Sequence, residues 1–308
     1  MPKVALRSVR PMSIAVIGVG RIGSTFAYQL AGAKHEVILV ARPGSERFEQ
    51  LRRDGGISLQ SGERAKMRVT DSLDEQEAYD LVIVTTLAHQ IDALLPTLRR
   101  SKARCIHFMF VNFNPESLRD AVGPDRCTFG MPAVQAMLDD EGKLSRKISK
   151  SMKTAHSDQR WVDLFEGAGI PSSFEADMLL WLRCHVPLCC AFESIAVAGK
   201  RRGGGASWKE SKAVARGLHG GWAIVQGLGY SLYPSAKSRM NSLPNFVLAF
   251  MMWGFSRVPA MRELLATGFN ECRALIDNMV TAANGKPALP KAVKAVLAMK
   301  PGNPAGAR

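Results

Sequence analysis

Six residues near the start of the chain have the types and spacing of a phosphate-binding turn: Gly18, Val19, Gly20, Arg21, Ile22 and Gly23. They follow the apolar run SIAVIG, typical of a buried strand, and they open a helical pattern. The first glycine permits a tight turn, the second lets the backbone approach a pyrophosphate, and the third lets the helix pack closely on the strand. The N–H groups at the helix start would then face the phosphates. The alternative is a glycine-rich turn without a ligand, but the strand, turn and helix together favour dinucleotide binding.

The end of the second expected strand indicates which dinucleotide would bind. NAD-binding proteins usually place Asp or Glu there to accept a hydrogen bond from the ribose 2′-hydroxyl. This chain has Arg42 at that point, with Ser45 and Arg47 close by. A guanidinium matches a 2′-phosphate, and no carboxylate stands there to repel it. We therefore expect NADPH rather than NADH; the alternative is that Arg42 is a surface cation.

The elements that must position these residues follow from the apolar pattern. The first 170 or so residues alternate short apolar runs with amphipathic stretches, which predicts a parallel sheet covered by helices. Between Arg126 and Lys153 the pattern favours strands, with a hairpin turn at Asp140-Glu141-Gly142 that adds antiparallel strands at the sheet edge. The expected strands are Ser13–Gly18, His35–Ala41, Asp80–Thr85 and Cys105–Val111, and the expected helices are Arg21–Ala33, Ser45–Asp54 (capped by Ser45) and Gln90–Arg100.

The character of the sequence changes after Gly169-Ile170-Pro171, and the remainder predicts long helices. Arg202-Gly203-Gly204-Gly205 is a flexible break between two of them, and the last helix runs from about Ala260 to Ala283. The fold class is thus α/β: an N-terminal Rossmann-type parallel-sheet domain, residues 12–172, followed by an all-helical domain for substrate binding or dimerisation, residues 173–300. Residues 1–11 and 301–308 read as disordered tails.

Charge and composition narrow the range of partners. The formal net charge is +14 over 308 residues. The basic residues are scattered and no aromatic residues interleave with them, which indicates solvated faces plus an anionic cofactor, not a nucleic-acid surface. Leu179–Ala198 contains charged residues and a proline, and Phe246–Phe255 is too short to span, so we expect no membrane segment. Phe246–Phe255 is a candidate for packing against a second subunit, which leaves a homodimer open.

The cysteines indicate a reducing compartment. None of the six cysteines belongs to a CxxC pair, and most lie in apolar runs, as expected for buried, reduced thiols of a cytoplasmic protein. The one cluster with metal-ligand types, Cys184, His185 and Cys189, does not have zinc-site spacing. We therefore expect no metal site.

The stretch SIAVIGVGRIGSTFAYQLAGAKHEVILVAR resembles the start of ketopantoate reductases (2-dehydropantoate 2-reductases). The resemblance extends from about Ser13 to Ala283 and implies hydride transfer from NADPH to a 2-oxo acid. It assigns phosphate binding to the three glycines and the 2′-phosphate to Arg42. It also implies that Gln90 and Asn112 lie near the cofactor. Leu87 stands where the family usually has a lysine, and Phe113 stands where it has the glycine of an Asn-Gly turn.

The second-domain signature of the family is matched in part. Its pattern is a tryptophan, a lysine two residues on, and then asparagines at four-residue steps. Here Trp181 fits, Arg183 stands at the lysine position, and Pro187 and Ala191 stand where asparagines are expected. The resemblance thus makes Arg183 and Asn112 the catalytic candidates. Arginine supplies charge and directed hydrogen bonds but is a very poor proton donor, so a proton must come from another group.

Three functions fit these residues. The first is an NADPH-dependent reductase of the ketopantoate reductase type, acting on a 2-oxo acid or a less polar ketone, because Leu87, Pro187 and Ala191 remove polar contacts. The second is a binding or regulatory protein that keeps the NADPH site without turnover. The third is an opine-type dehydrogenase, for which His219 would be the catalytic histidine. We expect Pro187 to kink or break its helix. Arg183 could instead pair with Glu175 or Asp177.

Overall fold

The computed structural model of the chain describes residues 10–302. They fall into two compact units, which we call unit 1 and unit 2. Unit 1 contains residues 10–110 and Glu116–Met178, and unit 2 contains Val111–Pro115 and residues 179–302. The tails expected at 1–11 and 301–308 lie mostly outside the described residues.

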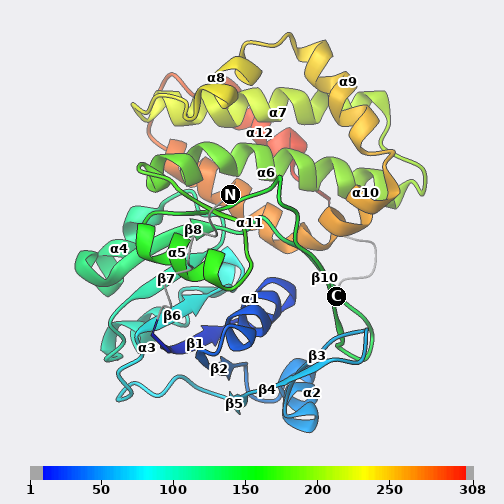
Figure 1. Cartoon of the computed structure of the whole chain (residues 1–308). Helices are drawn as coiled ribbons and strands as arrows, with labels where there is room; N and C mark the ends of the chain where they lie inside the picture. The colour runs from blue at the N-terminus through cyan, green and yellow to red at the C-terminus, as the bar shows by residue number, and fades with distance from the viewer. Residues whose placement is uncertain (1–9, 303–308) are drawn as a thin grey trace, which may run out of the picture. The chain divides into compact units, whose positions relative to one another are not determined.

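Unit 1 is built on a mainly parallel sheet, as expected from the alternating apolar pattern (Figure 1). Among the described residues the sheet has eight strands in the order β12-β11-β8-β7-β6-β1-β2-β5, and its one antiparallel pairing joins β8 to β11. The central strands are continuous apolar runs because both faces of a parallel sheet are covered. The strands are β1 (Ser13–Ile17), β2 (Glu36–Val40), β5 (Arg68–Thr70), β6 (Leu81–Val84), β7 (Ile106–Met109), β8 (Cys127–Met131), β11 (Thr154–His156) and β12 (Ser172–Phe174).

Helices α1 and α5 share the main core of unit 1. Phe26 of α1 and Phe165 of α5 are fully buried and meet edge to face, with ring centroids 5.0 Å apart. Ser45 caps α2 by accepting a hydrogen bond from the Phe48 N–H, as predicted. The helices of unit 1 are α1 (Arg21–Gly32), α2 (Glu46–Asp54), α3 (Leu95–Arg100), α4 (Pro115–Val122) and α5 (Gln159–Gly167), with short 3-10 turns η1 (Ala88–Gln90) and η2 (Pro124–Arg126).

Two predictions for unit 1 were wrong in detail. The helix expected from Gln90 begins only at Leu95, because Pro96 favours a helix start there and the preceding residues form turns. The hairpin with its turn at residues 139–143 exists, but its strands β9 (Gln135–Leu138) and β10 (Leu144–Lys147) form a separate sheet that packs against α1. A second small sheet pairs β3 (Gly56–Ser58) with β4 (Arg64–Lys66).

Unit 2 is helical. Its helices are α6 (Met178–Arg201, entered from unit 1 at Met178), α7 (Trp208–Gly227), α8 (Ser235–Asn241), α9 (Asn245–Phe255), α10 (Pro259–Leu265), α11 (Phe269–Ala283) and α12 (Pro290–Met299), with a 3-10 turn η3 (Ala266–Gly268). The helix expected over 260–283 is thus interrupted, and α12 was not foreseen from the sequence. Its signal was Pro290 at the first helical position, ahead of the buried Val296 and Met299.

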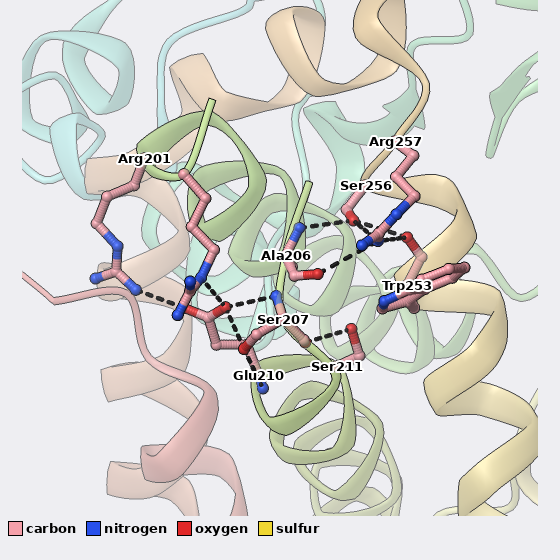
Figure 2. Close-up of polar contacts among 9 residues, drawn as sticks. Arg201, Ala206, Ser207, Glu210, Ser211, Trp253, Ser256 and Arg257 are labelled. Carbon is pink, nitrogen blue, oxygen red and sulfur yellow. Dashed lines mark hydrogen bonds and ion pairs between the residues drawn. The ribbon is translucent and has the colours of Figure 1, made fainter. Parts of the chain in front are cut away.

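The break between α6 and α7 is an ordered junction (Figure 2). Glu210 accepts hydrogen bonds from Ser207, the N-cap residue of α7, and from Arg201 and Arg202 at the end of α6. Burial acts to raise the pKa of Glu210, but these hydrogen bonds outweigh it and lower the pKa to about 2. The loop is also bound to the end of α9, because the Ala206 N–H donates to Ser256 at 2.9 Å. The predicted break is therefore present, with its backbone fixed at both ends.

Glycines on α7 let neighbouring helices pack closely. A side chain on Gly221 would lie 2.7 Å from Pro187 of α6, and one on Gly220 would lie 2.8 Å from the Ala292 carbonyl of α12. Helix α6 continues through Pro187, so the expected break does not occur. The Trp222 indole donates to the Cys184 carbonyl at 3.0 Å, giving the turn before the proline a hydrogen bond from outside the helix.

Two apolar helices need separate comment. Helix α6 is long and apolar enough to cross a membrane, but 56% of its most apolar window is buried within the protein, as in a core helix. This is weak evidence for a membrane segment. Helix α9 is shorter and exposes Phe246, Phe250 and Met251.

Candidate functional site

The first and third glycines of the loop after β1 are required by the protein itself. Gly18 has a φ of +87°, and a side chain there would lie 2.8 Å from the Thr86 nitrogen. A side chain on Gly23 would lie 2.5 Å from both the Gly18 carbonyl oxygen and the Thr85 hydroxyl. These two glycines therefore set the turn and the close approach of α1 to the sheet, as the sequence predicted.

Gly20 differs, because a side chain there would meet no protein atom within 4 Å. Its φ of −79° is open to any residue, so neither packing nor conformation explains the glycine. It stands at the N-terminus of α1, which has no side-chain cap and no acidic residue in its first turn. By helix geometry the first N–H groups of α1 lack acceptors within the helix. The bare Gly20 and this helix start together fit a pyrophosphate.

Arg42 follows β2 and is exposed. Its guanidinium has no hydrogen bond or ion pair with any residue in the range 10–302. Its backbone is fixed, because the Ser45 hydroxyl donates to the Arg42 carbonyl at 2.7 Å. An exposed cation on an anchored backbone at the end of the second strand fits a 2′-phosphate.

Arg47, which the sequence placed beside Arg42, is used differently. Its Nε donates to the Val19 carbonyl at 2.8 Å, and its Nη2 donates to the Ser24 hydroxyl at 2.6 Å. Burial lowers the pKa of Arg47 to about 10, partly offset by the charge of Asp54. Arg47 therefore hydrogen-bonds to the glycine loop and to α1.

The loop after β6 holds the other residues of unit 1 that the family comparison singled out. Leu87 is exposed, and the Gln90 side-chain oxygen accepts a long hydrogen bond from the Leu87 N–H at 3.4 Å. Two neighbours in this loop were not foreseen from the sequence. Thr85 donates to the Gly18 carbonyl at 2.7 Å, and the buried Thr86 hydroxyl has no partner within the described chain. Thr85 ties the carboxyl end of β6 to the glycine loop.

Unit 2 brings Arg183 to the Asn112 segment. Arg183 is buried at 4% exposure, and its Nε donates to the Phe113 carbonyl at 3.1 Å. Its guanidinium carbon lies 4.1 Å from the ring centre of Tyr230, a cation–π contact that sequence reasoning missed. Asn112 is also buried, and its side-chain oxygen accepts from the Asn114 N–H at 2.8 Å. The two predicted catalytic residues thus lie on neighbouring segments of one unit.

A second buried cation of unit 2 was not foreseen. Lys237 of α8 donates to the Trp181 carbonyl at 2.8 Å and lies 4.1 Å from the centre of the Trp181 ring. The His185 ring stacks on the Trp181 ring, with ring centroids 4.4 Å apart. Burial, with Lys237 adding to it, lowers the pKa of His185 to about 3. His185 is therefore uncharged at neutral pH.

The remaining candidates of unit 2 have structural contacts. Pro187 packs against Gly221 and Ala191 is fully buried, so both fill the helical core. His219 is half-buried and hydrogen-bonds through Nδ1 to the Asn241 side chain at 3.0 Å. Residues 10–302 contain no group of three or more histidine, cysteine or acidic side chains arranged to hold a metal ion.

A cavity of about 170 Å³ lies between α6, α7 and the end of α12. Its charged lining residues are Arg201, Glu210 and Lys300. Arg201 pairs with Glu210 at 2.7 Å, and Lys300 pairs with Asp277. The cavity does not include Arg183, so it is separate from the predicted catalytic residues.

Comparison with known families supports the sequence-based resemblance. Residues 14–159, just under half of the chain, match the family model described as ketopantoate reductase PanE/ApbA. The predicted family is confirmed over this part of the chain. No curated protein matches the chain.

Solved structures show the same fold. A PanE/ApbA family ketopantoate reductase from Ralstonia eutropha JMP134 is similar with a TM-score of 0.69 and 17% identity, over 94% of this chain and 96% of that one. D-mandelate dehydrogenase with NADH gives 0.66 and 15%, over 94% and 99%. A 2-dehydropantoate 2-reductase from Methylococcus capsulatus gives 0.62 and 18%, over 93% and 95%. The predicted fold class, a Rossmann-type sheet domain followed by a helical region, is confirmed.

Proposed function

We propose that this protein is an NADPH-dependent reductase of the PanE type that transfers a hydride to the carbonyl carbon of a 2-oxo acid or a less polar ketone. The proposal depends above all on the surroundings of Gly20. Its missing side chain serves no packing need of the protein and leaves the start of α1 open to a phosphate. The family match over residues 14–159 and the fold supply the reaction class.

The residues of unit 1 bind and orient the cofactor in this proposal. The N–H groups at the start of α1, around Arg21 and Ile22, bind the pyrophosphate beside Gly20. Arg42 pairs with the 2′-phosphate, which favours NADPH over NADH. Gln90 and Asn112 are the further cofactor contacts that the family resemblance suggests. A bound reduced nicotinamide would supply the hydride, one proton with two electrons, that carbonyl reduction requires.

Arg183 supplies the charge on the substrate side. Its burial and its contacts with the Phe113 carbonyl and the Tyr230 ring hold the guanidinium in one orientation. A preorganised cation stabilises the oxygen that becomes negative as the hydride reaches carbon. The guanidinium keeps its own protons at neutral pH, so the proton that completes the hydroxyl group comes from water or from another side chain.

The substrate is less polar than ketopantoate in this proposal. Leu87 is exposed where the family has a lysine, and Pro187 and Ala191 are packed in the core where it has asparagines. These same substitutions favour the second candidate function, an NADPH-binding protein without turnover. The D-mandelate dehydrogenase similarity illustrates that a protein with this fold can act on a compound with an aromatic group, although that likeness extends to the fold alone.

The cell compartment and the assembly belong to the same proposal. All six cysteines are free, as expected for a soluble protein of the reducing cytoplasm. The exposed Phe246 and Phe250 of α9 are the candidate contact for a homodimer.

The test is NADPH consumption by purified protein with ketopantoate and then with a panel of less polar 2-oxo acids and ketones. Binding of NADPH is measured in the same samples by the change in nicotinamide fluorescence. We expect binding, with turnover on one of the less polar compounds. Binding without turnover on any compound would replace the reductase by the non-catalytic alternative, and absence of binding would remove both.

A further inference from the structure

The guanidinium of Arg47 joins four separate segments of unit 1. Arg47 itself lies on α2. Its hydrogen bonds reach the Val19 carbonyl in the glycine loop at 2.8 Å, the Ser24 hydroxyl on α1 at 2.6 Å, and the Gly142 carbonyl in the β9–β10 turn at 2.8 Å. It also donates to the Gln50 side chain on its own helix.

The acceptors around this cation are neutral. Two are backbone carbonyls, one is a hydroxyl and one is a side-chain amide. Burial accordingly lowers the pKa of Arg47 to about 10, although the side chain still carries its charge at neutral pH. Burying a charge without a directly bonded carboxylate has a free-energy cost that packing alone does not require. The arrangement therefore indicates a role for the directed bonds themselves.

The bond to Val19 shows what these contacts do. Val19 lies between Gly18 and Gly20, and its carbonyl is held on the side of Arg47 and Ser24, whose hydroxyl also donates to it at 3.3 Å. A peptide group is planar, so fixing this carbonyl fixes the direction of the Gly20 N–H that belongs to the same peptide. The Gly20 N–H in turn donates to the Gly18 carbonyl at 2.7 Å, which closes the turn.

The β9–β10 hairpin supplies a further contact to Arg47. Gly142 has a φ of +76°, and a side chain there would contact the Gln50 amide and lie 3.0 Å from the Arg47 guanidinium. The turn thus approaches Arg47 as closely as its backbone allows. Gly142 is 123 residues from Val19 in the sequence, yet Arg47 donates a hydrogen bond to the carbonyl of each.

We propose that Arg47 is a positioning residue for dinucleotide binding: it holds the glycine loop in its binding shape without touching the cofactor. The identity of the ligand rests on the proposed function, whereas the effect of Arg47 on the shape of the glycine loop does not. Two arginines five residues apart thus have different roles. Arg42 is exposed and selects between NADPH and NADH, whereas Arg47 is committed to protein acceptors and supports both dinucleotides equally.

The experiment compares Arg47→Met with Arg52→Met, an exposed arginine on the same helix. Dissociation constants for NADPH and for NADH are measured with each purified full-length variant. We expect Arg47→Met to weaken both dinucleotides by the same factor of about tenfold or more, the effect of losing charge-assisted hydrogen bonds. Arg52→Met should bind both like the wild type. Unchanged binding by Arg47→Met, or weakening of NADPH alone, would overturn the proposal.

Hydrogen exchange on the ligand-free variants separates positioning from general destabilisation. We expect Arg47→Met to speed exchange over residues 19–24 while Leu81–Val84 in the sheet centre stays protected as in the wild type. Equal acceleration in both segments would show a merely structural role and overturn the proposal. If Arg47→Met does not fold, Gly142→Ala decides, because it crowds Arg47 from the hairpin. Gly142→Ala must weaken the binding of NADPH and of NADH by the same factor. A wild type that binds neither dinucleotide sinks the proposed function, whereas the exchange result still tests the loop.

Discussion

The loop after β1 and the surroundings of Arg183 offer a ligand different kinds of group. The loop offers backbone N–H groups at a helix start, and the only side-chain requirement at Gly20 is the absence of a side chain. The Arg183 region offers one side chain, held by the Phe113 carbonyl and the Tyr230 ring. Backbone recognition needs a local turn, whereas side-chain recognition needs segments brought together from distant parts of the sequence.

The two kinds of site respond differently to substitution. A backbone site constrains few residue types, and here the spacing of Gly18, Gly20 and Gly23 is complete. A side-chain site changes with each neighbouring residue, and here Pro187 and Ala191 are packed in the helical core. We therefore expect substitutions in unit 1 to change cofactor binding and substitutions around Arg183 to change turnover.

The largest effect is expected at Arg183. Arg183→Ala should lower turnover by about 100-fold or more, the usual loss for a donor to a developing oxyanion. The dissociation constant for NADPH should stay within about twofold of the wild type. Arg183→Lys is the matched variant, because it keeps the charge and adds a group that can donate a proton. It should retain turnover. Full activity of Arg183→Ala in steady-state assays would remove this residue from the catalytic site and weaken the comparison.

The next largest effects are expected at Gly20 and Gly23, two glycines of the same motif. Gly20→Ala adds a methyl group where no protein atom lies within 4 Å, so the thermal midpoint should not change. The methyl group should obstruct the pyrophosphate and weaken NADPH binding by about tenfold or more. Gly23→Ala places a methyl group 2.5 Å from the Gly18 carbonyl and should destabilise the protein by about 1–3 kcal/mol. Calorimetry and nicotinamide fluorescence measure both properties.

The comparison is contradicted if the two glycine variants behave alike. Loss of stability in Gly20→Ala would mean that the loop, not the ligand, requires that glycine. Normal NADPH binding by Gly20→Ala would mean that the phosphates lie elsewhere. Either result would also remove the observation on which the proposed function depends.

A smaller and more selective effect is expected at Arg42. Arg42→Glu replaces the cation at the end of β2 by an anion, which should weaken NADPH by about tenfold or more and leave NADH within about threefold. Arg52→Glu, the same charge change at another exposed position of this region, should affect both dinucleotides slightly and equally. Competition titrations with the two dinucleotides give the ratio directly. Equal weakening of both by Arg42→Glu would rule out the 2′-phosphate role.

The sequence predicted unit 1 more completely than unit 2 for physical reasons. The strand patterns, the Ser45 cap and the structural need for Gly18 and Gly23 are local signals, and each was confirmed. The use of Arg47 depends on Gly142, which folding brings from a distant hairpin, so no local pattern could assign it. In unit 2, Tyr230 and Lys237 approach α6 only through packing of several helices. The missed α12 is the exception, because Pro290 marked its start.

The buried histidines extend the comparison to stability. In unit 1, His107 Nε2 and His156 Nδ1 are hydrogen-bonded at 2.9 Å. The same hydrogen-bonded chain extends from His107 to Thr128 and from His156 to Ser172. Burial lowers the pKa of His156 to about 3, and burial together with His156 lowers the pKa of His107 well below its ordinary value. In unit 2, His185 also has a pKa of about 3, but its Nδ1 is buried without a partner in the described chain.

The sign of the pH effect follows from these shifts. Below pH 6.5 the unfolded histidines bind protons that the folded ones refuse, so stability falls as the pH falls from about 6.5 towards 3. The slope approaches about 1.4 kcal/mol per pH unit for each such histidine. His156→Gln should remove the contribution of one histidine from this slope of stability against pH. His89→Gln, at an exposed histidine, should leave the slope unchanged. Urea unfolding at pH 7.5 and pH 5.0 measures this difference. Because a hydrogen-bonded pair and a lone histidine both resist protonation through burial, His185→Gln should reduce the slope equally. A smaller reduction would mean that the hydrogen-bonded chain in unit 1, and not burial alone, keeps its histidines neutral.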